Sequence, residues 1–121
     1  DWMQRYEYII DLGKSLPLID EQFKTEDNII KGCQSKVWVH AEQQGEKVVF
    51  TSDSDAILTK GIIAILIRSF SNQKAADILE ANTDFIDKIG LKEHLSPTRA
   101  NGLVSMVKKI KMYALAFESK N

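Results

Sequence analysis

If residues 56–70 form a helix, apolar side chains occupy most of its circumference. The segment carries the large aliphatic residues Ile57, Leu58, Ile62, Ile63, Ile65, Leu66 and Ile67. A helix that is apolar on nearly every side is stable only when other elements cover it, so the segment predicts a central buried helix. Its longest apolar run, residues 61–67, is too short to span a bilayer. The rest of the chain must therefore supply the layers around this helix.

The chain has 121 residues, which is the length of one compact domain, so we expect a single domain over residues 1–121. Hydrophobic residues make up 44% and charged residues 27%, the proportions of an ordinary globular protein. The formal net charge of −1 gives no overall attraction to nucleic acid or to an anionic membrane. No signal-peptide pattern is visible, and we expect a cytoplasmic location. The first residue is Asp1 rather than Met, which leaves open whether a leader precedes it.

Residues 35–51 have the pattern of a β-hairpin. Between residues 35 and 41, apolar and polar side chains alternate, with Val37, Val39 and Ala41 between Lys36, Trp38 and His40. Residues 43–46 supply a turn, and residues 47–51 are β-branched and aromatic. Alternation followed by a glycine-containing turn and a second β-rich run predicts two antiparallel strands.

Helical patterns occupy most of the remaining chain. We expect helices over residues 2–12, 56–70, 74–80, 84–89 and 98–117, with a helical turn near Glu21. The expected ends are Gly13 for the first and Gly90 for the fourth, and Ser96-Pro97 starts the last one. Four residues are plausible N-caps of the central helix, namely Ser52, Asp53, Ser54 and Asp55. The predicted fold class is α+β, a small antiparallel β-sheet packed against several α-helices.

Cys33 is the only cysteine of the chain, which excludes an internal disulfide and a multi-thiolate metal site. A free cysteine often packs as a small buried hydrophobe. Its neighbours favour a different position, because Gly32 suits an exposed loop tip and residues 34–35 are polar. Lys31 and Lys36 are close enough in sequence to stabilise a thiolate, which is the reactive form. We therefore expect a loop cysteine that a partner can reach, with a buried structural cysteine as the alternative.

His40 and His94 are the two candidates for a general base beside Cys33 in a thiol enzyme. His40 lies in the first expected strand, and His94 lies just before the last helix. Neither has a recognisable Asp or Asn partner, and a lone histidine is more often structural. The spacing of Cys33 and the histidines does not match a zinc site, and one thiolate does not hold an iron–sulfur cluster. We expect no metal and no bound cofactor.

Residues 32–39 closely resemble the Gly-Cys-Gln-Ser-x-Val-Trp signature of the SufE family of sulfur-acceptor proteins. In this chain they read Gly32-Cys33-Gln34-Ser35-Lys36-Val37-Trp38-Val39. Three further blocks resemble the same family: Tyr8–Gly13 with Leu16-Pro17, Ser52–Ala56 with Lys60-Gly61, and His94–Leu103. Together the four blocks cover nearly the whole chain in the family's order.

The resemblance implies an α+β fold similar to that of the IscU scaffold proteins. It implies that Cys33 accepts a persulfide sulfur from a pyridoxal-phosphate cysteine desulfurase of the SufS or CsdA kind and stimulates that enzyme. In the Suf pathway the recipient is the SufBCD scaffold, on which iron–sulfur clusters are built. We expect a sulfur-transfer partner rather than an enzyme, a monomer or weak homodimer, with no nucleic-acid or membrane partner.

The matched positions imply supporting roles around Cys33. Gly32 is the expected pivot of a loop that moves between an apolar pocket and the surface. Gln34 and Ser35 are placed to hydrogen-bond around the sulfur. Trp38 either packs in the fold or lines the cysteine pocket.

Three charged positions complete the predicted site. Asp53 and Asp55 either cap the central helix or help to hold the Cys33 loop closed. Arg99, near the start of the last helix, contacts the desulfurase, stabilises the thiolate or forms a surface salt bridge.

Three hypotheses remain open from the sequence. The first is the sulfur carrier, and the second is a self-sufficient thiol enzyme that uses Cys33 with His40 or His94 as base. The third is an interaction module in which Cys33 has no function. A scaffold of the IscU kind is disfavoured, because such scaffolds present several cysteines.

Overall fold

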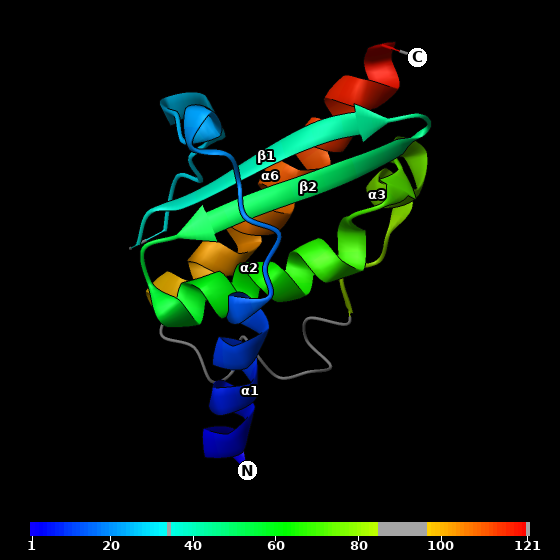
Figure 1. The fold of residues 1–121 in the computed structure, drawn as a ribbon. Coiled ribbons are helices and arrows are strands. Elements are labelled where there is room, and N and C mark those ends of the chain that lie inside the picture. The colour runs from blue at the N-terminus through cyan, green and yellow to red at the C-terminus, as the bar shows by residue number, and fades with distance from the viewer. Residues whose placement is uncertain (34, 85–96, 121) are drawn as a thin grey trace.

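The computed structural model describes residues 1–33, 35–84 and 97–120. Within these ranges, three antiparallel strands form one sheet in the order β1-β2-β3. The strands are β1 (Val37–Gln44), β2 (Lys47–Ser54) and β3 (Gln73–Lys74). The α-helices described are α1 (Trp2–Lys14), α2 (Ile57–Phe70), α3 (Ala75–Glu80) and α6 (Pro97–Lys120). Figure 1 shows α6 behind the strands and α2 running below β2, so the predicted α+β architecture is confirmed.

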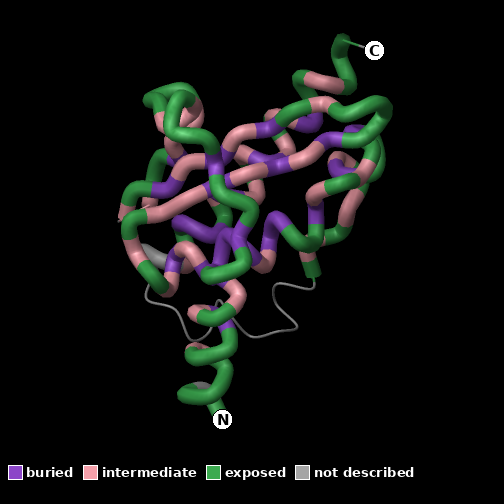
Figure 2. The backbone as a smooth tube through the Cα atoms, viewed as in Figure 1, coloured by how far each residue is buried: buried purple, intermediate pink, exposed green. Residues whose placement is uncertain are grey.

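The buried layer lies between the sheet on one side and the helices α2 and α6 on the other. Ile63 is fully buried in α2, as are Val39 in β1 and Ile110 in α6. Figure 2 shows this layer as buried backbone in the strands and α2, whereas much of α1 is exposed. The central buried helix is therefore confirmed, with one exception, since Ile57 at its first position is 69% exposed.

The hairpin is longer than the sequence pattern predicts. Its ladder runs from the pair Val37–Ser54 to the pair Gln44–Lys47. Gly45 has a φ of +63° and takes the first central position of a two-residue turn, where positive φ is favoured. Because the turn is tight, backbone pairing between β1 and β2 continues to Gln44 and Lys47, although both residues are polar.

The start of α2 corrects one prediction. Its N-cap is Ala56, which makes no side-chain capping bond, so the predicted cap by residues 52–55 is wrong. Pairing with β1 holds Asp53 and Ser54 in β2 instead. The short strand β3 is a second difference, because two residues carry too little pattern to be recognised in the sequence.

Helix α1 crosses α2 at very short range. A Cβ atom added to Gly61 of α2 would lie 2.1 Å from the carbonyl oxygen of Ile9 in α1. A Cβ at Gly13 would lie 3.0 Å from the backbone nitrogen of Gly61. The two glycines therefore allow the helix backbones to come into contact.

The chain between α1 and β1 passes over the sheet on the side away from α2 and α6 (Figure 1). It includes the 3-10 turns η1 (Glu21–Phe23) and η2 (Glu26–Asn28), the first of which agrees with the predicted turn near Glu21. It bridges β2 through Leu18 and β1 through Ile29. We call residues 17–30 the crossing segment.

Tyr113 connects α6 to both β1 and the crossing segment. Its hydroxyl oxygen lies 2.9 Å from the carbonyl oxygen of Val39 and is hydrogen-bonded to the side chain of Asn28. Burial, with a smaller effect of nearby Asp27, raises the pKa of Tyr113 to about 12. The hydroxyl therefore stays protonated at neutral pH.

Candidate functional site around Cys33

Cys33 lies between the crossing segment and β1, in a loop of residues 31–36 that we call the Cys33 loop. The side chain is half-buried and packs against the hydrophobic core. Its sulfur atom lies 3.8 Å from the carbonyl oxygen of Gly102 in α6, where the thiol donates a weak hydrogen bond. The cysteine is thus neither a core residue nor an exposed tip, but rests against a helix.

Two glycines allow this close approach of the loop to α6. A Cβ atom at Gly102 would lie 3.1 Å from the Cys33 sulfur. Gly32 has a φ of +87°, and a Cβ there would lie 3.1 Å from Oγ of Ser105, one turn further along α6. A Cβ atom at either position would require the facing side-chain atom to shift by a few tenths of an ångström.

The local environment favours the neutral thiol. Burial raises the pKa of the Cys33 thiol above its ordinary value. Lys31 and Lys36, which the sequence suggested as thiolate-stabilising charges, are both exposed. In the arrangement seen here, desolvation therefore outweighs any help from these lysines, and the thiol is in its less reactive form.

Backbone hydrogen bonds close both ends of the Cys33 loop. On one side, the amide of Ile30 donates to the carbonyl of Val37 at 2.8 Å. On the other side, the amide of Lys36 donates to Oδ1 of Asp55 at 3.0 Å. The amide of Asp55 in turn donates to the carbonyl of Lys36 at 3.2 Å. Asp55 therefore contacts the loop directly, which is one of the two roles predicted for it.

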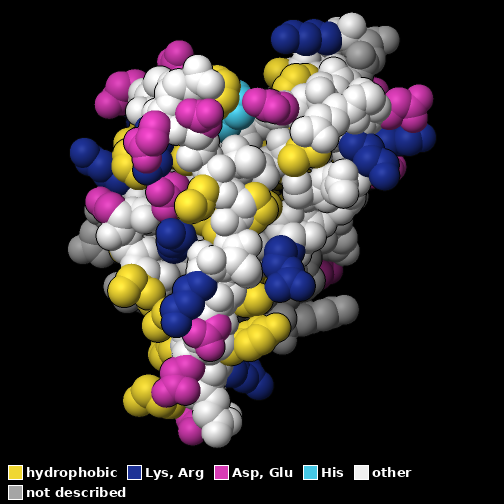
Figure 3. All heavy atoms as spheres, in the orientation of Figure 1, with side chains coloured by type: hydrophobic (Ala, Val, Ile, Leu, Met, Phe, Trp, Pro, Cys, Tyr) yellow, Lys and Arg dark blue, Asp and Glu magenta, His cyan; other side chains and the backbone are white. Residues whose placement is uncertain are grey.

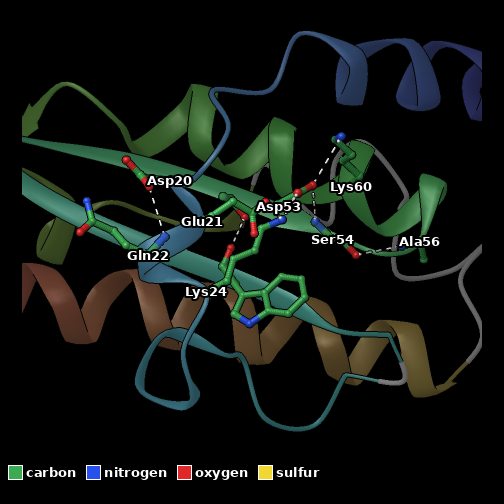
Figure 4. A network of polar contacts seen from close by, with 10 residues as sticks. Asp20, Glu21, Gln22, Lys24, Asp53, Ser54, Ala56 and Lys60 are labelled. Carbon is green, nitrogen blue, oxygen red and sulfur yellow. Dashed lines mark hydrogen bonds and ion pairs between the residues drawn. The ribbon is translucent and has the colours of Figure 1, made fainter.

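Asp53 serves a different part of the structure. Its carboxylate forms ion pairs with Lys24 of the crossing segment at 2.9 Å and with Lys60 of α2 at 3.4 Å (Figure 4). Burial tends to raise the pKa of Asp53. Hydrogen bonds from Lys24 and the Ser54 amide, with the charges of both lysines, outweigh burial and hold this pKa below its usual value. Asp53 thus joins the crossing segment, β2 and α2.

Trp38 belongs to the same outer face of the sheet. It alternates with the buried Val37 and Val39 along β1, and Lys24 Nζ lies 5.3 Å from the centre of its ring. Since Cys33 rests against α6 on the buried side, the structure does not bring Trp38 to the sulfur. It supports the packing role for this residue.

His40 also faces away from the thiol. Its ring stacks on Phe23 of the crossing segment at 3.7 Å between centroids, and Nε2 lies 3.4 Å from Oε1 of Glu42. These residues help to line a hollow of about 270 Å³ on the outer face. His40 therefore cannot act as the general base of Cys33 in this arrangement, which contradicts that form of the thiol-enzyme hypothesis.

The structure describes the other predicted site residues only in part. Ser35 lies half-buried in the Cys33 loop. Gln34 and His94 lie outside the described residues, as does the predicted helix from residue 85 onward. Arg99 lies in the first turn of α6, and its side chain is outside the described part.

Two residues at the site had no role predicted from the sequence. Gly102 and Ser105 lie three residues apart on α6, so they share the helix face that meets the Cys33 loop. A glycine inside a helical pattern costs about 1 kcal/mol relative to alanine, so Gly102 is itself a sequence signal for close backbone approach. Lys24 was also missed, and no sequence pattern distinguishes it from other surface lysines.

Metal ligands do not cluster in the described ranges. Among residues 1–33, 35–84 and 97–120, no group of three or more His, Cys, Asp or Glu side chains is arranged to hold an ion. On the face shown in Figure 3, basic and acidic side chains are interspersed. Of the helices described, none combines the length and the apolar character needed to cross a membrane.

Comparison with known proteins identifies the family. Residues 1–114 match the family model "SufE: Fe-S metabolism associated domain". An uncharacterized SufE-like protein from Rhizobium meliloti is 43% identical over 94% of this chain and 85% of its own length. One from Synechocystis is 37% identical over 98% of this chain and 74% of its own length.

Two further comparisons concern length and fold. SufE-like protein 1 of Arabidopsis thaliana, described as chloroplastic/mitochondrial, is 43% identical over 96% of this chain, which spans only 32% of that protein. A solution structure of a hypothetical protein from Thermus thermophilus superposes with a TM-score of 0.76 over 94% of this chain and 84% of that one. At 22% identity, this likeness shows a shared fold.

Proposed function

The chain belongs to the SufE family, whose members are associated with iron–sulfur metabolism, and from this premise we propose that it carries sulfur on Cys33. The observation that carries the proposal is the position of Cys33. This thiol lies in the segment that resembles the family's signature, in a loop that rests on α6 and is held at both ends by hydrogen bonds.

The proposed reaction is a thiol–persulfide exchange. The Cys33 thiolate attacks the terminal sulfur of a persulfide on the partner's cysteine. A sulfur–sulfur bond forms at Cys33 while the one in the donor breaks, and the donor cysteine leaves as a thiolate that takes up a proton. The product is a persulfide on Cys33, and no external oxidant or reductant is needed.

Such a reaction requires two states of the Cys33 loop. In the closed state the thiol rests on Gly102 and its pKa is raised by burial, so it reacts slowly. In an open state the thiol is solvated and ionises more readily, which suits nucleophilic attack. Gly32 is the proposed pivot, and the Asp55–Lys36 contact is the proposed latch. Return to the closed state protects the loaded sulfur from oxidants and stray thiols.

The proposed partners follow from the family. Membership of the SufE family implies an interaction with a cysteine desulfurase. We propose a desulfurase of the SufS or CsdA kind as donor and a SufBCD-like scaffold as recipient, in the cytoplasm. The chain would act as a monomer or weak homodimer and stimulate the desulfurase by removing its persulfide sulfur.

Mass spectrometry after incubation with a cysteine desulfurase and free cysteine tests the proposal. The protein should gain the mass of one or more sulfur atoms at Cys33. A Cys33→Ser variant should neither gain this mass nor stimulate the desulfurase. Normal stimulation by this variant would show that the carrier function is wrong.

A further inference from the structure

Gly102 is placed where its missing side chain defines the resting position of the thiol. Of the described atoms outside its chain neighbours and its own helix backbone, the three nearest to a Cβ at position 102 all belong to Cys33. The distances are 3.1 Å to the sulfur, 3.7 Å to Cα and 3.8 Å to Cβ. Only the first is tighter than ordinary van der Waals contact, so the sulfur atom alone occupies the space that a side chain would take.

Gly102 lies inside a helix, where glycine is an unfavourable residue. Gly102 is buried in the second turn of a 24-residue helix, where glycine costs about 1 kcal/mol relative to alanine. Gly102 also supplies the carbonyl oxygen that accepts the weak thiol hydrogen bond. The helix is thus less stable at the one position where the sulfur needs room.

We propose that Gly102 is a positioning residue for sulfur transfer, because the size of the residue at this position sets how often the Cys33 thiol leaves α6 and becomes exposed. The inference rests on the proposed function for its biological meaning, but its physical content concerns only the loop and the helix. A larger residue at 102 overpacks the closed state and shifts the loop toward the open one. Glycine leaves room for the thiol to stay packed against α6 between transfers.

The first test is the rate at which Cys33 is alkylated by iodoacetamide in the full chain. Gly102→Ala should raise this rate about tenfold, which corresponds to about 1.4 kcal/mol of overpacking in the closed state. The pH profile of alkylation should also move to lower pH, because the open thiol is no longer desolvated. Asn101→Ala is the matched control, since Asn101 is exposed and the change also raises helix propensity. The control should alkylate at the wild-type rate, and a wild-type rate in Gly102→Ala would overturn the proposal.

The second test is a double-mutant cycle between positions 33 and 102, measured by thermal unfolding. In a Cys33→Ala background the sulfur is gone, and a Cβ at 102 meets only the atoms at 3.7 and 3.8 Å. There Gly102→Ala should raise Tm through helix propensity, whereas beside Cys33 it should raise Tm less or lower it. Equal effects in the two backgrounds, including equal loss of folding, would overturn the proposal.

These readouts need no desulfurase, so the two proposals fail separately. A chain that gains no sulfur at Cys33 but shows the expected alkylation and unfolding behaviour refutes the carrier function and supports the role of Gly102. A chain that gains sulfur but shows no effect of residue size at 102 refutes the role of Gly102 and supports the carrier function.

Discussion

Asp55 and Lys36 are joined by two hydrogen bonds that extend the β1–β2 ladder by one pair beyond Val37 and Ser54. The Lys36 amide donates to the Asp55 carboxylate at 3.0 Å, and the Asp55 amide donates to the Lys36 carbonyl at 3.2 Å. The first of these bonds uses a side chain where a strand would use its backbone. The Cys33 loop therefore ends at two hydrogen bonds, one of which a single substitution of Asp55 can remove.

Asp55→Ala should make the Cys33 thiol more reactive. The Lys36 amide would lose its carboxylate acceptor, and a net hydrogen bond of about 1 kcal/mol corresponds to about a fivefold change in the opening equilibrium. Iodoacetamide labelling of Cys33 measures this change. Asp55→Asn keeps an oxygen acceptor in place and should stay closer to the wild-type rate. Wild-type labelling in both variants would show that Asp55 does not hold the loop.

Gly32→Val should slow sulfur transfer from a desulfurase without unfolding the protein. A β-branched residue at a φ of +87° is strained by about 1–2 kcal/mol and also meets Ser105, so the loop can no longer pivot freely between its closed and open states. Gly45→Val is the control, because Gly45 has a φ of +63° and nothing lies within 4 Å of an added Cβ. It should cause similar backbone strain at the hairpin turn and leave transfer unchanged. An unaltered transfer rate in Gly32→Val would rule out the proposed pivot.

Asp53 should make stability depend on pH in the acid range. Its pKa is held below the ordinary value of 3.8 in the folded chain, so the folded state favours the charged carboxylate. The stabilisation is complete above the unfolded pKa and is lost as pH falls through the folded pKa. Urea unfolding should show Asp53→Asn less stable than wild type at neutral pH, with the difference shrinking on acidification. A difference that is constant with pH would contradict this account.

The sequence predicts the fold well where one segment carries its own pattern. The apolar circumference of residues 56–70 identifies α2, and the alternation after residue 35 identifies the hairpin. The start of α6 at Pro97 matches the cap signal of Ser96-Pro97. Each of these elements is determined mainly by its own residues, so periodicity and caps are sufficient to find it.

The site depends on contacts between distant segments, and there the sequence is less informative. The position of Cys33 against Gly102 joins residues 69 apart, and no local pattern records that distance in sequence. Likewise, the polar run around Asp53 has the composition of a helix cap, but strand pairing and Lys24 determine its actual structure. Only the family signature pointed to Cys33 as the acceptor.

The Tyr113 hydroxyl has a consequence for how the protein can move. By contacting both Val39 and Asn28, it fastens the helix behind the sulfur to the strand and the segment on either side of the loop. These contacts do not involve residues 31–36, so they can persist if that loop rearranges. Under the proposed function, sulfur transfer would then need only a local movement of the loop, and the helix and strand that hold the closed thiol would keep their arrangement between transfers.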